Sequence, residues 1–320
     1  MVTTLKNIMK ILVTGASGLI GNYLLNYLYK KFPEADFYGT THKNIPKSKF
    51  KVVYISYSEI FKTKLRFDQI WHFATYGQPL KFMKNWRDVI NLNTNHLFNL
   101  CNLLSPTGKF LFASSSEIYD SNGDGLESEP PASFTCRPRS IYIDSKRLGE
   151  SILNSLLPKD SYRIFRICLA YSPYFKSDDN RVMYELILKG LKNNEIKLID
   201  EGEAIRQYIY IEDACEMMVE IANREYKKLL LDEAPPIFNI SNSFEPITIY
   251  ELAKLIGSNL NVSVRKGPAN SNLYFAPKLV KVYPERFLKI FPKYKFVTTK
   301  EGIKKVCNEA QKNFSITMNQ

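Results

Sequence analysis

Short apolar runs alternate with longer segments of helical spacing through the first half of the chain. The runs are rich in β-branched and aromatic residues, which favours buried strands. They are Lys10–Thr14, Asp36–Thr40, Val52–Ile55, Phe67–Thr75, Phe110–Ala113 and Tyr162–Ile167. Between them, apolar residues three and four positions apart predict helices, which we place at Asn22–Lys31, Trp86–Leu104 and from Tyr142 to Leu157. Strands and helices in alternation predict an α/β fold with a doubly wound parallel sheet of the Rossmann type.

The pattern changes near residue 173, where a polar stretch over residues 172–180 precedes shorter and more irregular elements. We expect helices at Val182–Asn193, after Asp213, and at Ile249–Ile256 behind a Thr248 cap, with strands at Ile196–Ile199, Ala204–Ile211 and Phe238–Ile240. The chain is therefore expected to form one domain over residues 1–172. A smaller, interrupted lobe should occupy residues 173–320, with part of it returning to the first sheet.

A glycine-rich turn joins the first strand to the first helix. Residues 15–21 read Gly-Ala-Ser-Gly-Leu-Ile-Gly. Strand, glycine turn and helix in this order are typical of a dinucleotide site, in which Gly15 permits the tight turn, Gly18 lets the backbone approach a pyrophosphate, and Gly21 allows the helix to pack closely. The spacing is one residue wider than the commonest fingerprint, and an ordinary glycine turn is the alternative. We predict cofactor contacts from Gly15, Ser17, Gly18, Leu19, Ile20 and Gly21, at the positive end of the helix.

The residues after the second strand bear on which dinucleotide binds. An acidic residue there recognises the adenosine ribose of NAD, whereas this chain has Thr41, His42 and Lys43. Hydroxyls and a cation suit a 2′-phosphate, so NAD and NADP are both left open, and simple solvation of a loop is the other interpretation. Ala74 is small enough for backbone to approach the cofactor. Asn93 is polar on an apolar helix stripe, where it either bonds the neighbouring strand or orders a proton-relay water.

Polar residues follow the run Phe110–Ala113 and recur on the next helix. Ser115 and Glu117 come directly after the run, and a parallel sheet carries its chemistry at the carboxyl ends of its strands. Tyr142 and Lys146 are four residues apart, so they lie one above the other on a helix. An ammonium beside a phenol lowers the pKa of the phenol, which makes Tyr142 a candidate general base. With twenty tyrosines in the chain this spacing also arises by chance, so the assignment depends on the other motifs.

Composition argues against several other classes of site. The 320 residues are 45% apolar, which is enough for one large or two modest cores. No apolar run approaches the ~20 residues of a membrane span, and we expect a soluble, cytoplasmic protein. Five scattered cysteines and three histidines without ligand spacing favour neither disulfides nor a metal centre, and His72, in mid-strand, is expected in the core. The net charge of +12 is dispersed, which suits anionic ligands better than nucleic acid.

Taken together, these motifs resemble the extended short-chain dehydrogenase/reductase family, in particular its nucleotide-sugar epimerases, dehydratases and decarboxylases. The resemblance runs through nearly the whole chain, over the glycine turn, Trp71–Ala74, Asn93, Ser114–Tyr119, Tyr142 with Lys146, Arg166, Arg206–Asp213 and Phe238–Ile240. Residues 113–119, 138–142 and 146–150 are most similar to UDP-glucuronate decarboxylases and, somewhat less, to GDP-mannose 4,6-dehydratases. Residues 78–83 also resemble the decarboxylases' substrate loop.

The resemblance implies an NAD(P)-dependent enzyme that oxidises C4 of a nucleotide-diphosphate sugar to a 4-keto intermediate, in the biosynthesis of cell-surface glycans such as lipopolysaccharide or capsule. Tyr142 would take the proton of the 4-hydroxyl, Lys146 would bind the nicotinamide ribose, and Ser115 would hydrogen-bond the same sugar oxygen. Glu117 would act at C5 or assist loss of a C6 carboxylate. A carboxylate there favours dehydration or decarboxylation over 4-epimerisation, 4-oxidation or 4-keto reduction.

The resemblance also implies a dinucleotide-binding domain over residues 1–172 and a substrate lobe after it. Ser116, Arg181 and Arg206 would contact the substrate, with Arg206 at its diphosphate, where a planar guanidinium suits phosphate oxygens. A homodimer would form through the helices of Asn93 and Tyr142.

Several positions depart from the family pattern. They are Asp120 in place of a glycine, His96-Leu97 in place of Gly-Thr, Leu169 in place of an asparagine that touches the substrate, and Ser172 in place of a glycine. A leucine cannot make that polar contact, so a divergent sugar is expected. A cofactor-binding regulatory protein without catalysis is the alternative of another class. Intact Ser115, Tyr142 and Lys146 argue against it.

Overall fold

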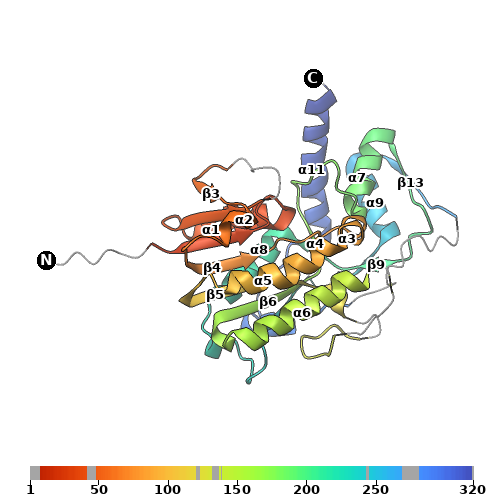
Figure 1. Ribbon diagram of the computed structural model, residues 1–320. Helices are drawn as coiled ribbons and strands as arrows, with labels where there is room; N and C mark the ends of the chain where they lie inside the picture. The colour runs from red at the N-terminus through yellow and green to blue at the C-terminus, as the bar shows by residue number, and fades with distance from the viewer. Residues whose placement is uncertain are drawn as a thin grey trace.

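The computed structural model describes residues 8–41, 48–119, 123–131, 137, 139–242, 245–268 and 281–318. Its centre is a seven-stranded sheet in the order β11-β6-β5-β4-β1-β2-β3 (Figure 1). The strands are β1 (Lys10–Thr14), β2 (Asp36–Thr40), β3 (Val52–Tyr54), β4 (Phe67–His72), β5 (Leu104–Ser115), β6 (Tyr162–Ile167) and β11 (Ile237–Ile240). All six pairings are parallel. The strand order reverses at β1, between β2 and β4, which is where open α/β sheets form a ligand crevice.

Helices cover both faces of this sheet. The helices α4 (Trp86–Asn91), α5 (Leu97–Cys101) and α6 (Ser140–Leu156) lie in front of the strands in Figure 1. The helices α1 (Leu19–Lys31) and α8 (Ile211–Asn223) contact each other, and α8 also packs on β6. Two short helices, α2 (Tyr57–Ile60) and α3 (Pro79–Lys84), follow β3 and β4. The expected doubly wound parallel sheet of the Rossmann type is confirmed.

The residues after β6 form smaller sheets and a second group of helices at one end of the main sheet (Figure 1). The strand pairs are β7 (Leu169–Tyr171) with β10 (Tyr208–Tyr210), β9 (Ile205–Arg206) with β12 (Ile247–Thr248), and β8 (Glu195–Lys197) with β13 (Ser263–Arg265). The helices are α7 (Val182–Asn193), α9 (Ile249–Leu260) and α11 (Thr299–Met318), while α10 (Glu285–Ile290) packs on β11 of the main sheet. Because β11 lies within the main sheet, part of this region returns to the first sheet.

Most predicted elements are present with small changes at their ends, but two predictions were wrong. The helix expected over Trp86–Leu104 is interrupted by a π-helical segment, Leu92–His96, and ends at Cys101. The carbonyl oxygen of Leu92 lies 2.8 Å from His72 Nε2, and a side chain that engages a helix carbonyl disturbs the regular ladder. His72 itself is buried in the core, as expected.

The second wrong prediction is the single strand over Ala204–Ile211. It is two strands separated by Gln207, whose side-chain amide pairs with the main chain of Val282, and Ile211 already belongs to α8. By contrast, Thr248 caps α9 as predicted, and Glu251 completes a capping box. Within the described ranges, no helix has the length and apolarity needed to cross a membrane.

The glycine turn brings α1 unusually close to the main sheet. Gly15 has a φ of +68°, and a Cβ placed on it would lie 2.9 Å from the backbone of Ala74, just beyond β4. A Cβ on Gly21 would lie only 2.3 Å from the carbonyl oxygen of Gly15. Neither position has room for a side chain, so the sequence must supply glycine at both.

We expect Gly21→Ala to lower the free energy of unfolding of the cofactor-free protein by about 1–3 kcal/mol, which is the usual cost of overpacking. Denaturation by urea measures this difference. Gly77→Ala is the matched control, because a Cβ at Gly77 meets no described atom within 4 Å. Equal stability of the two variants would contradict the close packing of α1 on the turn.

Candidate active site

The candidate catalytic residues meet where β5 ends and α6 begins. Strand β5 ends at Ser115 and continues into a 3₁₀ turn, Ser116–Ile118, whose first free amide, that of Glu117, donates to Ser115 Oγ at 3.2 Å. Ser116 is buried at the start of this turn. On α6, Tyr142 and Lys146 both face this strand end and are 8% and 1% exposed. The structure thus brings together the three residues that the motifs singled out.

Tyr142 is held on two sides. On one side, Ser115 lies close enough to the phenol to lower its pKa, and on the other the ring stacks on Phe82 of α3, with centroids 4.4 Å apart and planes inclined by 9°. Burial, followed by the carboxylate of Glu117, raises the pKa of Tyr142 to about 12, against the opposing effects of Ser115 and Arg139. The phenol is therefore protonated at neutral pH in this state.

Lys146 points at the backbone rather than at the phenol. Its Nζ donates to the carbonyl oxygen of Ala113 at 2.6 Å and lies 4.8 Å from the ring centroid of Phe112 and 6.0 Å from that of Tyr142. Burial lowers the pKa of Lys146 to about 7, against the opposing effect of Glu150. The expectation that this ammonium leaves Tyr142 with a lowered pKa is wrong for this state, because Lys146 Nζ is directed at the Ala113 carbonyl and burial raises the pKa of the phenol.

A carboxylate flanked by two arginines lies beside Tyr142. Glu117 forms an ion pair with Arg139, which precedes α6, and both side chains are mostly buried. Burial raises the pKa of Glu117, and the nearby charges of Arg139 and Arg206 lower it. The guanidinium of Arg139 also lies 5.5 Å from the ring centroid of Phe82. Arg139 lies in the motif of residues 138–142, but the sequence does not predict it as a site residue, because only the fold reveals that it faces Glu117.

The two predicted substrate arginines differ in what holds them. Arg206, on β9, donates through Nη1 to the carbonyl oxygen of Ile205 at 2.8 Å. Burial lowers the pKa of Arg206, the charge of Arg139 lowers it too, and that of Glu117 raises it. Arg181 precedes α7 and forms an ion pair with Asp179, in which Nε lies 3.0 Å from Oδ1 and Nη2 lies 2.5 Å from Oδ2. Arg206 therefore belongs to the cluster around Glu117, whereas Arg181 is held by Asp179 and by the carbonyl oxygen of Ala170 on β7, to which Nη1 donates at 3.3 Å.

The crevice at the glycine turn fits a dinucleotide. The turn has no room for a Cβ at Gly15 or Gly21, and α1 has no acidic residue in its first turn, so its positive end is left for an anion. Two buried polar atoms near this edge, Asn93 Oδ1 and Thr75 Oγ1, have no hydrogen-bond partner among the described residues. Asn93 Nδ2 donates to Ser145 Oγ on α6 at 3.0 Å, so Asn93 bonds a helix rather than a strand.

The other predicted cofactor contacts lie along the same turn. Ser17, Leu19 and Ile20 are partly exposed there, next to the exposed Gly18. Thr41 is also partly exposed, at the end of β2, whereas His42 and Lys43 lie outside the described residues.

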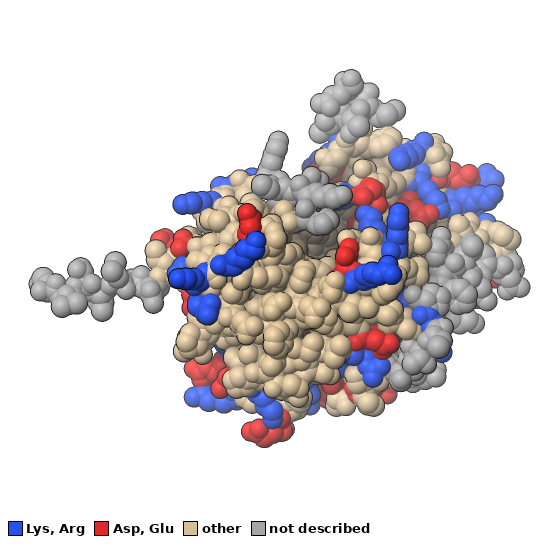
Figure 2. Space-filling view, in the orientation of Figure 1, with Lys and Arg blue, Asp and Glu red and all other residues tan. Residues whose placement is uncertain are grey.

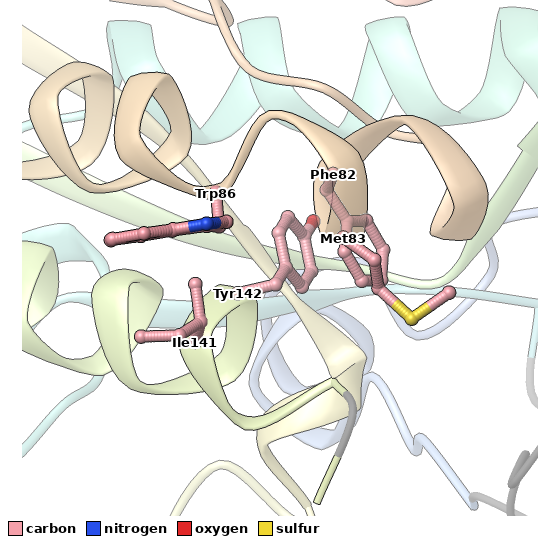
Figure 3. Close-up of a pocket in the computed structure, with 5 residues that line it drawn as sticks. All are labelled: Phe82, Met83, Trp86, Ile141 and Tyr142. Atoms are coloured by element: carbon pink, nitrogen blue, oxygen red, sulfur yellow. The ribbon is translucent and has the colours of Figure 1, made fainter.

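A pocket of about 320 Å³ opens next to Tyr142 (Figure 3). Its walls are Phe82, Met83, Trp86, Ile141 and Tyr142, so helices α3, α4 and α6 all contribute. Figure 3 shows the Tyr142 ring between Trp86 on one side and Phe82 with Met83 on the other. Over the part of the chain that the structure describes, no three His, Cys, Asp or Glu residues cluster as metal ligands would.

Relatives of known activity share much of the chain. UDP-glucuronic acid decarboxylase 5 of Arabidopsis thaliana is 28% identical over 273 residues, which cover 80% of this chain and 76% of the relative. UDP-glucuronic acid decarboxylase 1 of Xenopus tropicalis is 25% identical over 227 residues, covering 67% of this chain but only 53% of that relative.

Solved structures share the fold. A UDP-glucuronic acid 4-epimerase from Bacillus cereus, in a complex with NAD, superposes with a TM-score of 0.76 at 20% identity and covers 95% of this chain and all of the other. An NAD-dependent NDP-hexosamine 5,6-dehydratase of tunicamycin biosynthesis superposes with a TM-score of 0.74 at 18% identity, over 95% and 98% of the two chains. The family model described as "NAD dependent epimerase/dehydratase family" matches residues 11–241. Since that match spans well over half of the chain, this protein belongs to the NAD-dependent epimerase/dehydratase family of enzymes.

Proposed function

We propose that this enzyme oxidises C4 of a nucleotide-diphosphate sugar and then carries out chemistry at C5 or C6, with decarboxylation of a nucleotide-linked uronic acid as the first choice. The observation that carries the proposal is the ion pair of Glu117 with Arg139 directly beside Tyr142. Of the residues of this chain, oxidation at C4 by a bound nicotinamide needs Ser115, Tyr142 and Lys146 alone. A carboxylate and a guanidinium next to them suit a second step on the same sugar ring.

The residues around Tyr142 are suited to move one proton. Tyr142, as phenolate, takes the proton of the sugar 4-hydroxyl, and the Ser115 hydroxyl orients the same oxygen. Because the pKa of Tyr142 is about 12 in this state, positive charge must come close to the phenol before it can act as a base. When bound in the crevice above Gly15, a nicotinamide dinucleotide supplies the hydride acceptor.

Glu117, Arg139 and Arg206 are suited to the second step, at C5 or C6. A ketone at C4 acidifies the C5 proton and makes a C6 carboxylate labile. The planar guanidinium of Arg139 suits a carboxylate through two parallel hydrogen bonds, and Arg206 places a second positive charge nearby for the diphosphate. The relatives named as UDP-glucuronic acid decarboxylases support decarboxylation. Dehydration is the second candidate, since Glu117 is also placed to take the C5 proton.

We also propose a homodimer through α4, α5 and α6. Five large apolar side chains on these helices are 40% to 51% exposed, namely Trp86, Phe98, Ile141, Leu148 and Leu156. Figure 2 shows that the lower middle of this face carries mostly uncharged residues, with the acidic and basic side chains towards its edges. Exposed apolar patches of this kind mark contacts between proteins. A role in building cell-surface glycans would fit a nucleotide-sugar product.

Incubation with UDP-, GDP-, CDP- and dTDP-sugars, followed by mass spectrometry, tests the reaction. We expect a uronic acid substrate to lose about 44 mass units as carbon dioxide, whereas loss of about 18 would mean dehydration, loss of about 2 oxidation, and no change epimerisation. Tyr142→Phe is the control: it should bind the dinucleotide as the unchanged enzyme does and lose about 10²–10⁴-fold in turnover. Unchanged turnover in Tyr142→Phe would remove this residue from the mechanism.

Glu117→Gln separates the two steps. The amide keeps a hydrogen-bonding partner for Arg139 but cannot act as a base, so C4 oxidation should persist while the second step slows by about 10²–10⁴-fold. Reduced nicotinamide, followed by its absorbance, and the 4-keto sugar should both accumulate. Equal slowing of both steps would instead place Glu117 in the first step or in substrate binding.

Leu148→Glu tests the dimer. A charge on the apolar face of α6 should convert the dimer to a monomer in light scattering, because the carboxylate would be desolvated in the interface. Leu230→Glu, in the loop after α8, changes an apolar residue that is 59% exposed and should leave the mass unchanged. A monomeric mass for the unchanged protein would contradict the proposed interface.

A further inference from the structure

The helix that carries Tyr142 and Lys146 presents a third buried polar group, Glu150, to the same strand end. The three residues recur every four positions on α6, so they form one row along the helix. Each meets one of the last three residues of β5. Ser115 lies close enough to the Tyr142 phenol to lower its pKa, the Ala113 carbonyl oxygen accepts from Lys146 Nζ at 2.6 Å, and Ser114 Oγ donates to Glu150 Oε1 at 2.5 Å. The third contact has no role in the proposed reaction.

Strand β6 holds Glu150 from the other side, through Arg166. Arg166 lies beside Ser114 in the register of β5 and β6. Its Nε donates to Glu150 Oε1 at 3.1 Å and its Nη2 to Oε2 at 2.8 Å, with the two side chains 3% and 8% exposed. Its Nη1 donates to the Tyr119 hydroxyl, which donates to Asn239 Oδ1 on β11, both at 2.8 Å. A bidentate, fully buried pair of this kind fixes the carboxylate in one position.

We propose that Glu150 is a positioning residue for Lys146: its carboxylate, held by Arg166 and Ser114, places a fixed negative charge one helical turn from the Lys146 ammonium at the end of β5. Glu150 itself does not touch the sugar or the reacting atoms. The inference rests on the proposed function for one point, the role of Lys146 in the reaction.

Of the groups around Lys146, Glu150 is the one that favours its charged form. Burial lowers the pKa of Lys146 to about 7, and Glu150 raises it. On β4, His72 is neutral at physiological pH because burial lowers its pKa to about 3. On α6, Tyr142 is neutral with a pKa of about 12, and β5 contributes the Phe112 ring and a backbone carbonyl. On β6, the positive Arg166 is paired with Glu150, and among these neighbours Glu150 is the negative charge that favours the ammonium form.

The double variant Glu150→Gln/Arg166→Met tests the inference without leaving an unpaired buried charge, which would itself destabilise the core. The titration of Lys146 can be followed by NMR in cofactor-free protein with ¹³Cε-labelled lysines, with Lys146→Met to assign the signal. We expect the titration midpoint of Lys146 to move to lower pH in the double variant. Ser114→Ala, which keeps the ion pair, should move it less in the same direction. An unchanged midpoint in both variants overturns the proposal whether or not the enzyme turns over any sugar.

Turnover provides the second readout. The alkaline limb of the kcat profile should move to lower pH in the double variant, with turnover above that limb falling about tenfold for each pH unit of the movement, and with KM changing less. Arg163→Met is the matched control. Arg163 is a buried arginine at the other end of β6 that donates to main-chain carbonyls, so its loss should lower stability and leave the profile in place.

The two readouts separate the possible failures. A double variant that loses stability like Arg163→Met but keeps the wild-type pH profile would make Glu150 a structural residue and overturn the inference. If the unchanged protein turns over no nucleotide sugar, the proposed function fails, and the titration of Lys146 alone decides the role of Glu150.

Discussion

One face of α6 buries a phenol, an ammonium and a carboxylate in a core of apolar side chains, and the centre of the structure depends on the partners of the two charged groups. A buried polar group without a partner costs several kcal/mol, which is a large part of the free energy of unfolding of a typical domain. For the ammonium and the carboxylate, Ala113 and Ser114 of β5 and Arg166 of β6 supply those partners. Because the contacts recur along two turns of the helix, α6 cannot slide by one residue without breaking several of them at once. The position of Tyr142 beside Ser115 follows from this constraint.

The glycine turn imposes a second constraint, at the neighbouring strands. Gly15 meets the backbone of Ala74 and Gly21 meets Gly15, so β1, β4 and α1 approach one another more closely than side chains would permit. The backbone at this contact lines the bottom of the crevice, next to the end of β5. The chain beyond β6 then adds Arg206 to the rim, while Asn239 on β11 donates to the carbonyl oxygens of Gly125 and Tyr283 and ties the later segments to the sheet. A dinucleotide crevice and an anion-binding cluster therefore share one edge.

The electrostatics of the site show why the spacing of a motif does not determine the pKa values of its residues. Four-residue spacing places Lys146 one turn from Tyr142, and this part of the prediction is met. The pKa of Tyr142 is nevertheless about 12, because burial opposes the phenolate more than nearby positive charge favours it. The ammonium is directed at the Ala113 carbonyl, whose lone pairs satisfy it in place of water. The balance between these effects is a property of the packed site, and an isolated helix would not have it.

The sequence by itself determined the order of strands and helices, the glycine turn, the row of Tyr142 and Lys146, and the Thr248 cap, since each depends on residues close together in the chain. Local steric limits and periodicity are sufficient for such features. Only the tertiary structure decided that Arg139 pairs with Glu117, that Phe82 stacks on Tyr142, that Arg181 is held by Asp179, and that the helix after Trp86 contains a π-helical segment. Most of these contacts join segments that lie far apart in the chain, and the register of packed elements selects them. Burial, which decides the charge of each group, exists only once the chain has folded.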